Sequence, residues 1–260
     1  MNILKNKTFV LLYILSGFFI TNALVAEFIG VKIFSLEKTF GITPFDFTIF
    51  GVNGLGFNLT AGVLLWPVVF VMTDIINEYF GQKVVKFLSW LVVGLIVYAF
   101  IMVYLAIGLP PNDWWQSQSG LTSDASTSIA DMDLSYSRIM GQGLWIIVGS
   151  MVAFLVGQLV DVLVFHRIKE MTGEKSIWLR ATGSTLVSQF IDSFVVLFIA
   201  FYIGADWDFG RVMAIAIVNY IYKFVMAVLL TPVIYLVHAA VEKYLGAKLA
   251  TQMKDEAILQ

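Results

Sequence analysis

Residues 143–165 of this 260-residue chain read GLWIIVGSMVAFLVGQLVDVLVF. The stretch contains no proline and a single ionisable residue, Asp161. A helix on the surface of a soluble protein has a charged face, which this stretch lacks. It is also long enough to cross the hydrocarbon core of a bilayer, which takes about 20 apolar residues. The stretch therefore predicts a transmembrane helix.

The composition of the whole chain agrees with this prediction. The chain is 59% hydrophobic and 13% charged, its mean hydropathy is +0.86, and it has no cysteine. Soluble domains are about 25% charged, so an ordinary soluble enzyme and a disordered chain are excluded. The missing cysteines exclude a disulfide scaffold and a thiolate metal site. A net charge of -2 predicts no basic surface for nucleic acid.

Five further apolar runs resemble the first one in length. We therefore predict an all-α polytopic membrane protein, with six transmembrane helices in one domain that spans residues 1–260. The expected helices are 8–28, 59–80, 87–107, 143–165, 182–203 and 212–237. Pro67 is expected to kink the second helix.

Basic residues predict the orientation of the chain. Eleven of the 16 lysines and arginines fall on the side that holds both termini, four fall on the other side, and Lys223 lies inside the last helix. By the positive-inside rule, both termini are expected in the cytoplasm. Loop 30–58 on the outer side is rich in Phe and Gly and is expected to fold back as a plug or re-entrant segment. Loop 108–142 is expected to be a solvated excursion.

Polar residues inside the expected helices form pairs at spacings of three or four, which place each pair on one helix face. A charge at the bilayer centre costs a few kcal/mol, so such residues are functional candidates. The pattern predicts a polar cavity between the helices. Its candidate residues are Trp66, Phe70, Asp74, Asn77 and Glu78 of the second helix, Gln158 and Asp161 of the fourth, Gln189 and Asp192 of the fifth, and Asn219 and Lys223 of the sixth.

Structural roles are the alternative for several of these residues. Glu78, Asp161 and Asp74 lie toward the cytoplasmic ends of their helices, where they could pair with basic anchors. The candidate anchors are Lys83, Lys86, Arg167 and Arg180. Asp192 and Lys223 could form an ion pair that holds the fifth and sixth helices together. Nucleotide-hydrolysis, zinc-protease and serine-hydrolase motifs are missing, so no catalytic residue, metal ligand or cofactor is predicted.

Four motifs resemble the queuosine precursor transporter family of the vitamin uptake transporter group. They are TDIINEYFG at 73–81, GQLVD at 157–161 followed by FHR at 165–167, GST at 183–185 followed by DS at 192–193, and NYIYK at 219–223. The resemblance implies a six-helix fold similar to the substrate-binding subunits of energy-coupling-factor transporters. It also implies import of 7-deazaguanines such as preQ0, preQ1 or queuine across the bacterial inner membrane.

Such a base suits the candidate residues. Its N1–H and 2-amino group can donate to one carboxylate, its O6 can accept from Gln or Lys, and its face can stack on an aromatic ring. Tyr220 joins Trp66 and Phe70 as a candidate for that ring. A secondary carrier that works alone is the first hypothesis. The alternative is a substrate-binding subunit for another vitamin that depends on a separate ATPase module, and the sequence leaves open whether the chain forms a homo-oligomer.

Overall fold

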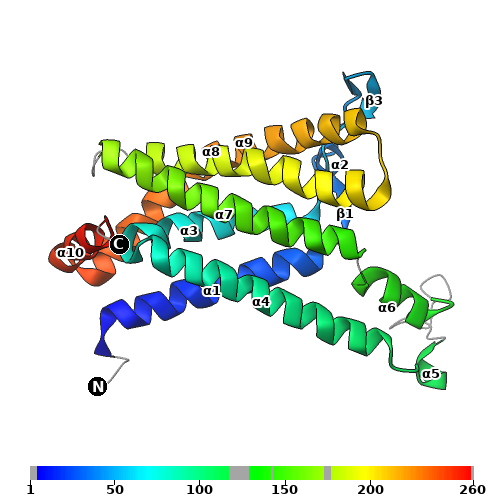
Figure 1. Ribbon diagram of the computed structural model, residues 1–260, viewed down its shortest axis with the longest axis horizontal. Coiled ribbons are helices and arrows are strands. Elements are labelled where there is room, and N and C mark those ends of the chain that lie inside the picture. Colours follow the sequence, from blue (N-terminus) through cyan, green and yellow to red (C-terminus); the bar gives the residue numbers. More distant parts are fainter. Residues whose placement is uncertain (1–4, 117–128, 142, 173–176, 259–260) are drawn as a thin grey trace.

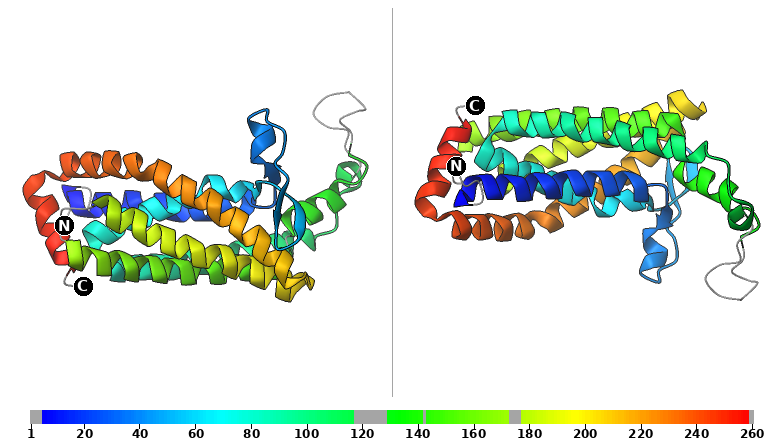
Figure 2. Two further views of the ribbon diagram at one scale, coloured as in Figure 1. Left: turned by 90° about the horizontal axis from the view of Figure 1, so that it is seen from above. Right: turned by 90° about the horizontal axis from the view of Figure 1, so that it is seen from below.

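A computed structural model describes residues 5–116, 129–141, 143–172 and 177–258. Long helices run lengthwise through one bundle, α10 lies across one end, and short strands project from the other end (Figures 1 and 2). The described elements are α1 (Lys7–Ile29), β1 (Ile33–Ser35), α2 (Leu36–Thr39), β2 (Phe47–Ile49), β3 (Val52–Leu55), β4 (Asn58–Thr60), the 3₁₀ helix η2 (Ala61–Leu64), α3 (Trp66–Phe80), α4 (Gln82–Ile107), α5 (Asp113–Gln116), α6 (Met132–Met140), α7 (Leu144–Thr172), α8 (Ile177–Leu197), the π-helix η5 (Phe198–Ile203), α9 (Phe209–Leu245) and α10 (Ala247–Ile258).

Among the residues that the structure describes, five helical segments are long and apolar enough to cross a membrane. They contain α1, α4, α7, α8 with η5, and α9. The expectation of an all-α, multi-pass membrane protein is confirmed in this form. The count of six is not, because the second expected helix, 59–80, is divided into the end of β4, η2 and the 15-residue α3.

The short helix α3 is the centre of the bundle. Every residue from Val69 to Phe80 is buried, and the helix packs on α1, α4, α7, α9 and α10. Pro67 lies in the first turn of α3, where its missing N–H would have had no partner within the helix. The predicted kink at Pro67 is therefore wrong, and the proline marks a helix start instead.

A tight turn at Gly81 joins α3 to α4. Its φ of 81° lies in the left-handed region, which only glycine adopts without strain. The turn lets two helices follow each other without a loop. It places the buried carboxyl end of α3 at the end of the bundle that carries both termini, where α10 packs against it (Figure 1).

Small residues bring α7 close to α8 and η5. A Cβ on Gly149 would lie 3.0 Å from the Val196 carbonyl oxygen, and a Cβ on Gly157 would lie 3.5 Å from the Asp192 Cβ. Gly149, Ala153 and Gly157 recur every four residues, and close contact of this kind is what small residues permit between membrane helices. Through this contact the polar face of α7 reaches that of α8.

The outer segment between α1 and η2 forms two antiparallel strand pairs, β1 with β4 and β2 with β3. It projects from the end of the bundle, and most of residues 38–54 are exposed (Figure 2). Leu55 is an exception, because it packs against Ala214 and Val218 of α9. The segment therefore does not enter the bundle as a plug. It folds onto the end of the bundle, where Phe34, Leu36 and Phe57 also pack against a cluster that includes Tyr222 of α9.

Glu37 holds this outer segment together. Its Oε1 accepts from the Phe57 amide at 2.7 Å, and its Oε2 accepts from the Ser35 hydroxyl at 2.9 Å. Burial works to raise the pKa of Glu37, but these hydrogen bonds outweigh burial and lower the pKa below its ordinary value. The carboxylate form is therefore the one that the fold stabilises.

The opposite end of the bundle is covered by α10. Lys254 forms an ion pair with Glu242 of α9 at 2.6 Å and lies over the Tyr79 ring of α3. The Tyr79 hydroxyl is 3.1 Å from His238 Nδ1. The contacts of Lys254 thus bind α10 to α9 and α3, and the contact between Tyr79 and His238 joins these two helices to each other.

Candidate functional site

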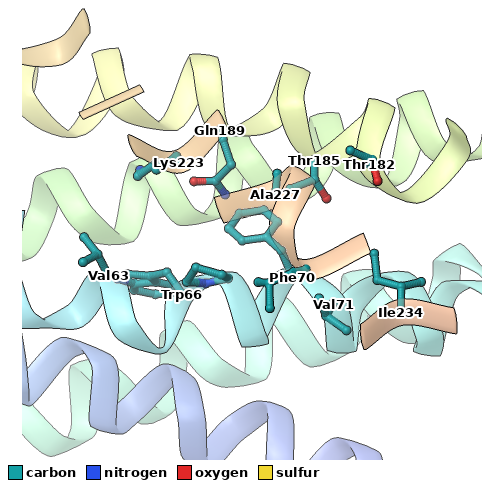
Figure 3. Close-up of a pocket in the computed structure, with 12 residues that line it drawn as sticks. Val63, Trp66, Phe70, Val71, Thr182, Thr185, Gln189, Lys223, Ala227 and Ile234 are labelled. Carbon is teal, nitrogen blue, oxygen red and sulfur yellow. The ribbon is translucent and has the colours of Figure 1, made fainter. Parts of the chain in front are cut away.

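A narrow cavity lies between α3, α8 and α9 (Figure 3). The space open to the centres of water-sized molecules is about 20 Å³, which is room for about one water. Twelve side chains line it: Val63, Trp66, Pro67, Phe70, Val71, Thr182, Thr185, Gln189, Lys223, Ala227, Leu230 and Ile234. The wall is thus largely apolar with a few polar groups, which is the usual make-up of a small-molecule site.

Trp66 and Phe70 form the aromatic side of the cavity. They lie one turn apart on α3 and face the polar residues of α8 and α9 in Figure 3. The Trp66 ring packs on Phe154 of α7 with 5.5 Å between centroids. On the side of η2, a Cβ on Gly62 would lie 3.4 Å from the indole nitrogen and only 2.7 Å from the Ala26 carbonyl oxygen. The indole is therefore held between η2 and α7.

Gln189 and Lys223 form the polar side. Lys223 makes an ion pair with Asp192, which lies one turn after Gln189 on α8. Both members of the pair are largely buried, with 12% of the lysine and 18% of the aspartate side chain exposed. The Gln189 Nε2 group is buried and has no hydrogen-bond acceptor. The structure thus confirms the predicted ion pair between these helices and places it beside an unused donor.

Asp74 and Asp161 lie next to the cavity without lining it. Thr185, which does line it, donates to Asp74 Oδ2 at 3.5 Å. Ser188, on the same helix, donates to Asp161 Oδ1 at 3.1 Å. The side chains of both aspartates are buried, with 1% and 0% exposed. Hydroxyl groups of α8 thus connect the cavity with two carboxyl groups contributed by α3 and α7.

Two buried amides lie on the same helices as this pair of carboxyl groups. Gln158 Oε1 accepts from the Thr73 hydroxyl at 2.9 Å, which joins α7 to α3. Gln158 Nε2 and both polar atoms of the Asn77 side chain have no hydrogen-bond partner. The contact between α3 and α7 therefore has polar capacity that the described side chains do not use.

Glu78 takes part in an ion network. Arg180 of α8 lies 2.6 Å from its Oε1, and Lys169 of α7 lies 3.3 Å from its Oε2. All three side chains are buried, with at most 3% exposed. Of the roles considered for Glu78, pairing with Arg180 is the one that the geometry matches. The burial of Arg180 and Lys169 was missed, because both follow apolar stretches and read as loop charges.

Asn219 and Tyr220 lie away from the cavity. Asn219 donates to the Ile215 carbonyl oxygen of its own helix at 3.1 Å. The Tyr220 ring packs edge-on against Phe190 and Phe224, which are 48% and 44% exposed. Tyr220 therefore belongs to an outward-facing aromatic group, and the structure does not bring it to Trp66 and Phe70.

Four of the twelve predicted site residues thus line the cavity: Trp66, Phe70, Gln189 and Lys223. The sequence reasoning missed the apolar residues of α9 that complete the wall. Ala227, Leu230 and Ile234 follow Lys223 at spacings of four, three and four, so they continue its helix face. That spacing was the available signal, but in an apolar helix it does not stand out from its surroundings.

In the part of the chain that the structure describes, no group of three His, Asp or Glu side chains could hold a metal ion. The polar groups found are hydrogen-bond donors and acceptors around a narrow, mostly apolar space. Such an arrangement can bind and orient a small polar molecule.

The comparisons with known proteins identify the family. The family model described as "Putative vitamin uptake transporter" matches residues 60–237. Three relatives are each 28% identical to this chain: a "Probable queuosine precursor transporter" of Haemophilus influenzae over 78% of this chain and 80% of the relative, one so named of Bacillus subtilis over 71% and 73%, and the "Queuosine precursor transporter" of Escherichia coli over 68% and 71%. No solved structure matches. Because the family model matches well over half of the chain, the chain belongs to the vitamin uptake transporter family, a family of transporters.

Proposed function

We propose that this protein imports queuosine precursors, 7-deazaguanines such as preQ0, preQ1 or queuine, across a bacterial inner membrane as a secondary carrier. The proposal is carried by the cavity between α3, α8 and α9, whose aromatic and hydrogen-bonding sides suit a flat, polar base. The names of the three relatives support the same substrate class.

In this proposal the base lies against Trp66 and Phe70, and its polar edge meets Gln189 and Lys223. The O6 atom of a 7-deazaguanine is an acceptor, and Lys223 Nζ and Gln189 Nε2 are donors beside the cavity. The N1–H and 2-amino groups are donors, and Asp192 is the acceptor next to Lys223. Inserting the base edge between the two charges would replace their ion pair with hydrogen bonds to the substrate.

The cavity has room for about one water, so we propose that the bundle is in a closed state here and that binding requires α3 to separate from α8 and α9. Movements of this type give alternating access in secondary transporters, where the substrate site lies between helices near the middle of the membrane. The ion network at Glu78 and the cover formed by α10 lie toward the end with both termini, and we propose that they close the inner side.

We further propose six membrane crossings, with α3 as the second. Its 15 residues span about 22 Å at 1.5 Å per residue, which is shorter than the bilayer core. Since neighbouring helices surround α3, it does not need to match the lipid thickness. Both termini lie at one end of the bundle (Figure 1), as an even number of crossings requires, and the excess of Lys and Arg on that side supports a cytoplasmic location. Likeness to the subunits of energy-coupling-factor transporters stays a prediction.

Binding to the purified protein tests the substrate. A thermal shift with preQ0, preQ1, queuine and guanine is expected to show stabilisation by the deazaguanines, of about 2.7 kcal/mol at 100 times the Kd. Gln189→Ala and Trp66→Ala are expected to weaken the shift. Gln252→Ala serves as the matched control, because Gln252 is exposed on α10. Stabilisation by another vitamin instead of any deazaguanine would refute the substrate assignment.

Uptake into proteoliposomes that contain only this protein tests the mechanism. A secondary carrier moves a deazaguanine under these conditions, since no ATPase module is present. Binding without uptake, restored by adding an ATPase module, would favour the alternative of a substrate-binding subunit.

A further inference from the structure

We propose that Asp74 and Asp161 together hold one exchangeable proton, and that Thr185 couples this proton to the contents of the cavity. The coupling to substrate rests on the proposed transport function. The presence of the proton is a property of the two carboxyl groups and can be measured without any substrate.

The first observation is burial without a counter-ion. Asp74 and Asp161 are 1% and 0% exposed, and neither forms an ion pair with a lysine, arginine or histidine in the part of the chain that the structure describes. Two ionised carboxylates in a dry interior carry a desolvation penalty of several kcal/mol each. One proton shared between the two groups neutralises one of the two charges and removes their mutual repulsion.

The second observation is the inventory of their oxygen atoms. On each carboxyl group one oxygen accepts from a hydroxyl of α8, namely that of Thr185 for Asp74 and that of Ser188 for Asp161. The other oxygen of each, Asp74 Oδ1 and Asp161 Oδ2, has no hydrogen-bond partner among the described residues. Thr185 and Ser188 lie three residues apart on one face of α8, so the two carboxyl groups that they contact are neighbours. An ionised carboxylate only accepts, whereas a protonated one also donates, so one proton can satisfy both remaining oxygens.

The third observation concerns the surroundings of the pair. Gln158 lies one turn before Asp161 on α7 and is tied to Thr73, the neighbour of Asp74. Its Nε2 group has no acceptor although the residue is only 1% exposed. Asn77, one turn after Asp74, has two further unpartnered atoms. The pair thus lies among polar groups whose hydrogen-bonding capacity the described side chains leave unused.

The other charged groups of the packed helices already contact one another. Arg180 and Lys169 contact Glu78, which lies one turn after Asp74. Lys223 pairs with Asp192. Three further titratable groups on the neighbouring helices also have partners. Glu27 of α1 accepts a hydrogen bond from Ser150, and His238 of α9 is hydrogen-bonded to Tyr79. Lys254 of α10 pairs with Glu242 and lies over the Tyr79 ring.

Thr185 links the pair to the cavity, because it both lines the cavity and donates to Asp74. A ligand that draws the Thr185 hydroxyl toward itself removes a hydrogen bond that favours ionised Asp74. Ligand binding then strengthens the hold on the proton, and by reciprocity the proton strengthens ligand binding. A carrier with this link moves substrate and proton in the same direction.

Infrared difference spectroscopy of the purified, substrate-free protein tests for the proton. We expect a carbonyl band of a protonated carboxyl group that shifts in D₂O, is lost in Asp74→Asn and Asp161→Asn, and is kept in Asp255→Asn, which changes an exposed carboxylate of α10. If the asparagine variants do not fold, Thr185→Val is expected to displace the band while retaining it. Absence of the band from the native protein, or an unchanged band in all three site variants, would overturn the proposal.

Uptake of preQ1 into proteoliposomes tests the coupling. An inwardly directed proton gradient is expected to drive accumulation, and Asp74→Asn is expected to abolish this effect of the gradient. Accumulation driven by a sodium gradient alone would overturn proton coupling. A protein that shows the infrared band but binds no deazaguanine refutes the proposed substrate and leaves the proton in place, so the two failures can be told apart.

Discussion

The network of Glu78, Arg180 and Lys169 allows a quantitative test of the packing near the end of the bundle that carries both termini. Replacing Arg180 with Met removes the guanidinium, which is fully buried and lies 2.6 Å from Glu78 Oε1. The carboxylate then retains Lys169, at the longer distance of 3.3 Å. Removing one partner of a buried ion pair costs about 3–5 kcal/mol, because the other partner remains buried with less compensation.

This loss of unfolding free energy is large enough to measure on the detergent-solubilised protein. For a chain of this size, 1 kcal/mol corresponds to about 2–4 °C in Tm, so Arg180→Met is expected to lower Tm by about 6–20 °C. The matched control is Arg167→Met on α7, because Arg167 forms only an exposed pair with Glu170, at 3.5 Å, and such a pair contributes about 0–1 kcal/mol.

The double variant separates pairing from packing. Combining Arg180→Met with Glu78→Gln removes the charge on both sides, so the loss should be smaller than the sum of the two single losses, by about 0.5–3 kcal/mol. Equal effects of the two arginine variants, or strict additivity in the double variant, would refute the reasoning that this network stabilises this end of the bundle through its charges.

Three further predictions concern helix contact, the outer segment and topology. Gly149→Ala is expected to destabilise the protein by about 1–3 kcal/mol, since the added methyl group would lie 3.0 Å from a carbonyl oxygen of α8. The control Gly94→Ala places its methyl group where no atom lies within 4 Å, so it should stabilise the helix by up to about 1 kcal/mol. Chemical denaturation measures both, and the opposite ranking of the two variants would contradict the packing. Because the pKa of Glu37 is lowered in the folded state, its contribution to stability is fully present above the pKa of the unfolded state and is lost as the pH falls through the folded-state pKa. Proteolysis of the outer segment should therefore accelerate on acidification, whereas the Glu37→Gln variant should be cleaved rapidly at every pH. The chain has no cysteine, so the variants Lys38→Cys and Asp255→Cys each contain a single thiol. An impermeant maleimide added to intact cells is expected to label Lys38→Cys and not Asp255→Cys, and the reverse result would show the opposite topology.

Much of the bundle was predictable from local sequence because a membrane helix must be both long and apolar. The stretch at 143–165 lies within α7 except for its first residue, and four other expected helices also lie in segments that can cross a membrane. The second expected helix was drawn too long, because apolar residues 59–65 are equally compatible with a strand end and a 3₁₀ turn. Pro67 was the signal for the true start, since proline fits the first turn of a helix better than its middle.

The polar residues were predictable as a set, and their grouping was not. Spacing placed Asp74 with Glu78 on one face of α3, yet the fold gives them different partners: Thr185 for the first, and Arg180 with Lys169 for the second. Periodicity fixes the face of a helix, whereas the partner depends on the depth and rotation of the neighbouring helix.

The sequence by itself determined that the chain crosses a membrane, that polar residues lie inside the helices, and which family motifs it carries, because each of these follows from composition and from spacing along one helix. Only the tertiary structure decided which of those residues line a common cavity, that Tyr220 points elsewhere, and that Asp74 and Asp161 both contact hydroxyl groups of α8 and have no counter-ion among the described residues. The physical reason is that such contacts join residues as far apart as Asp74 and Thr185, and their geometry is set by how closely small residues such as Gly149 and Gly157 let the helices approach.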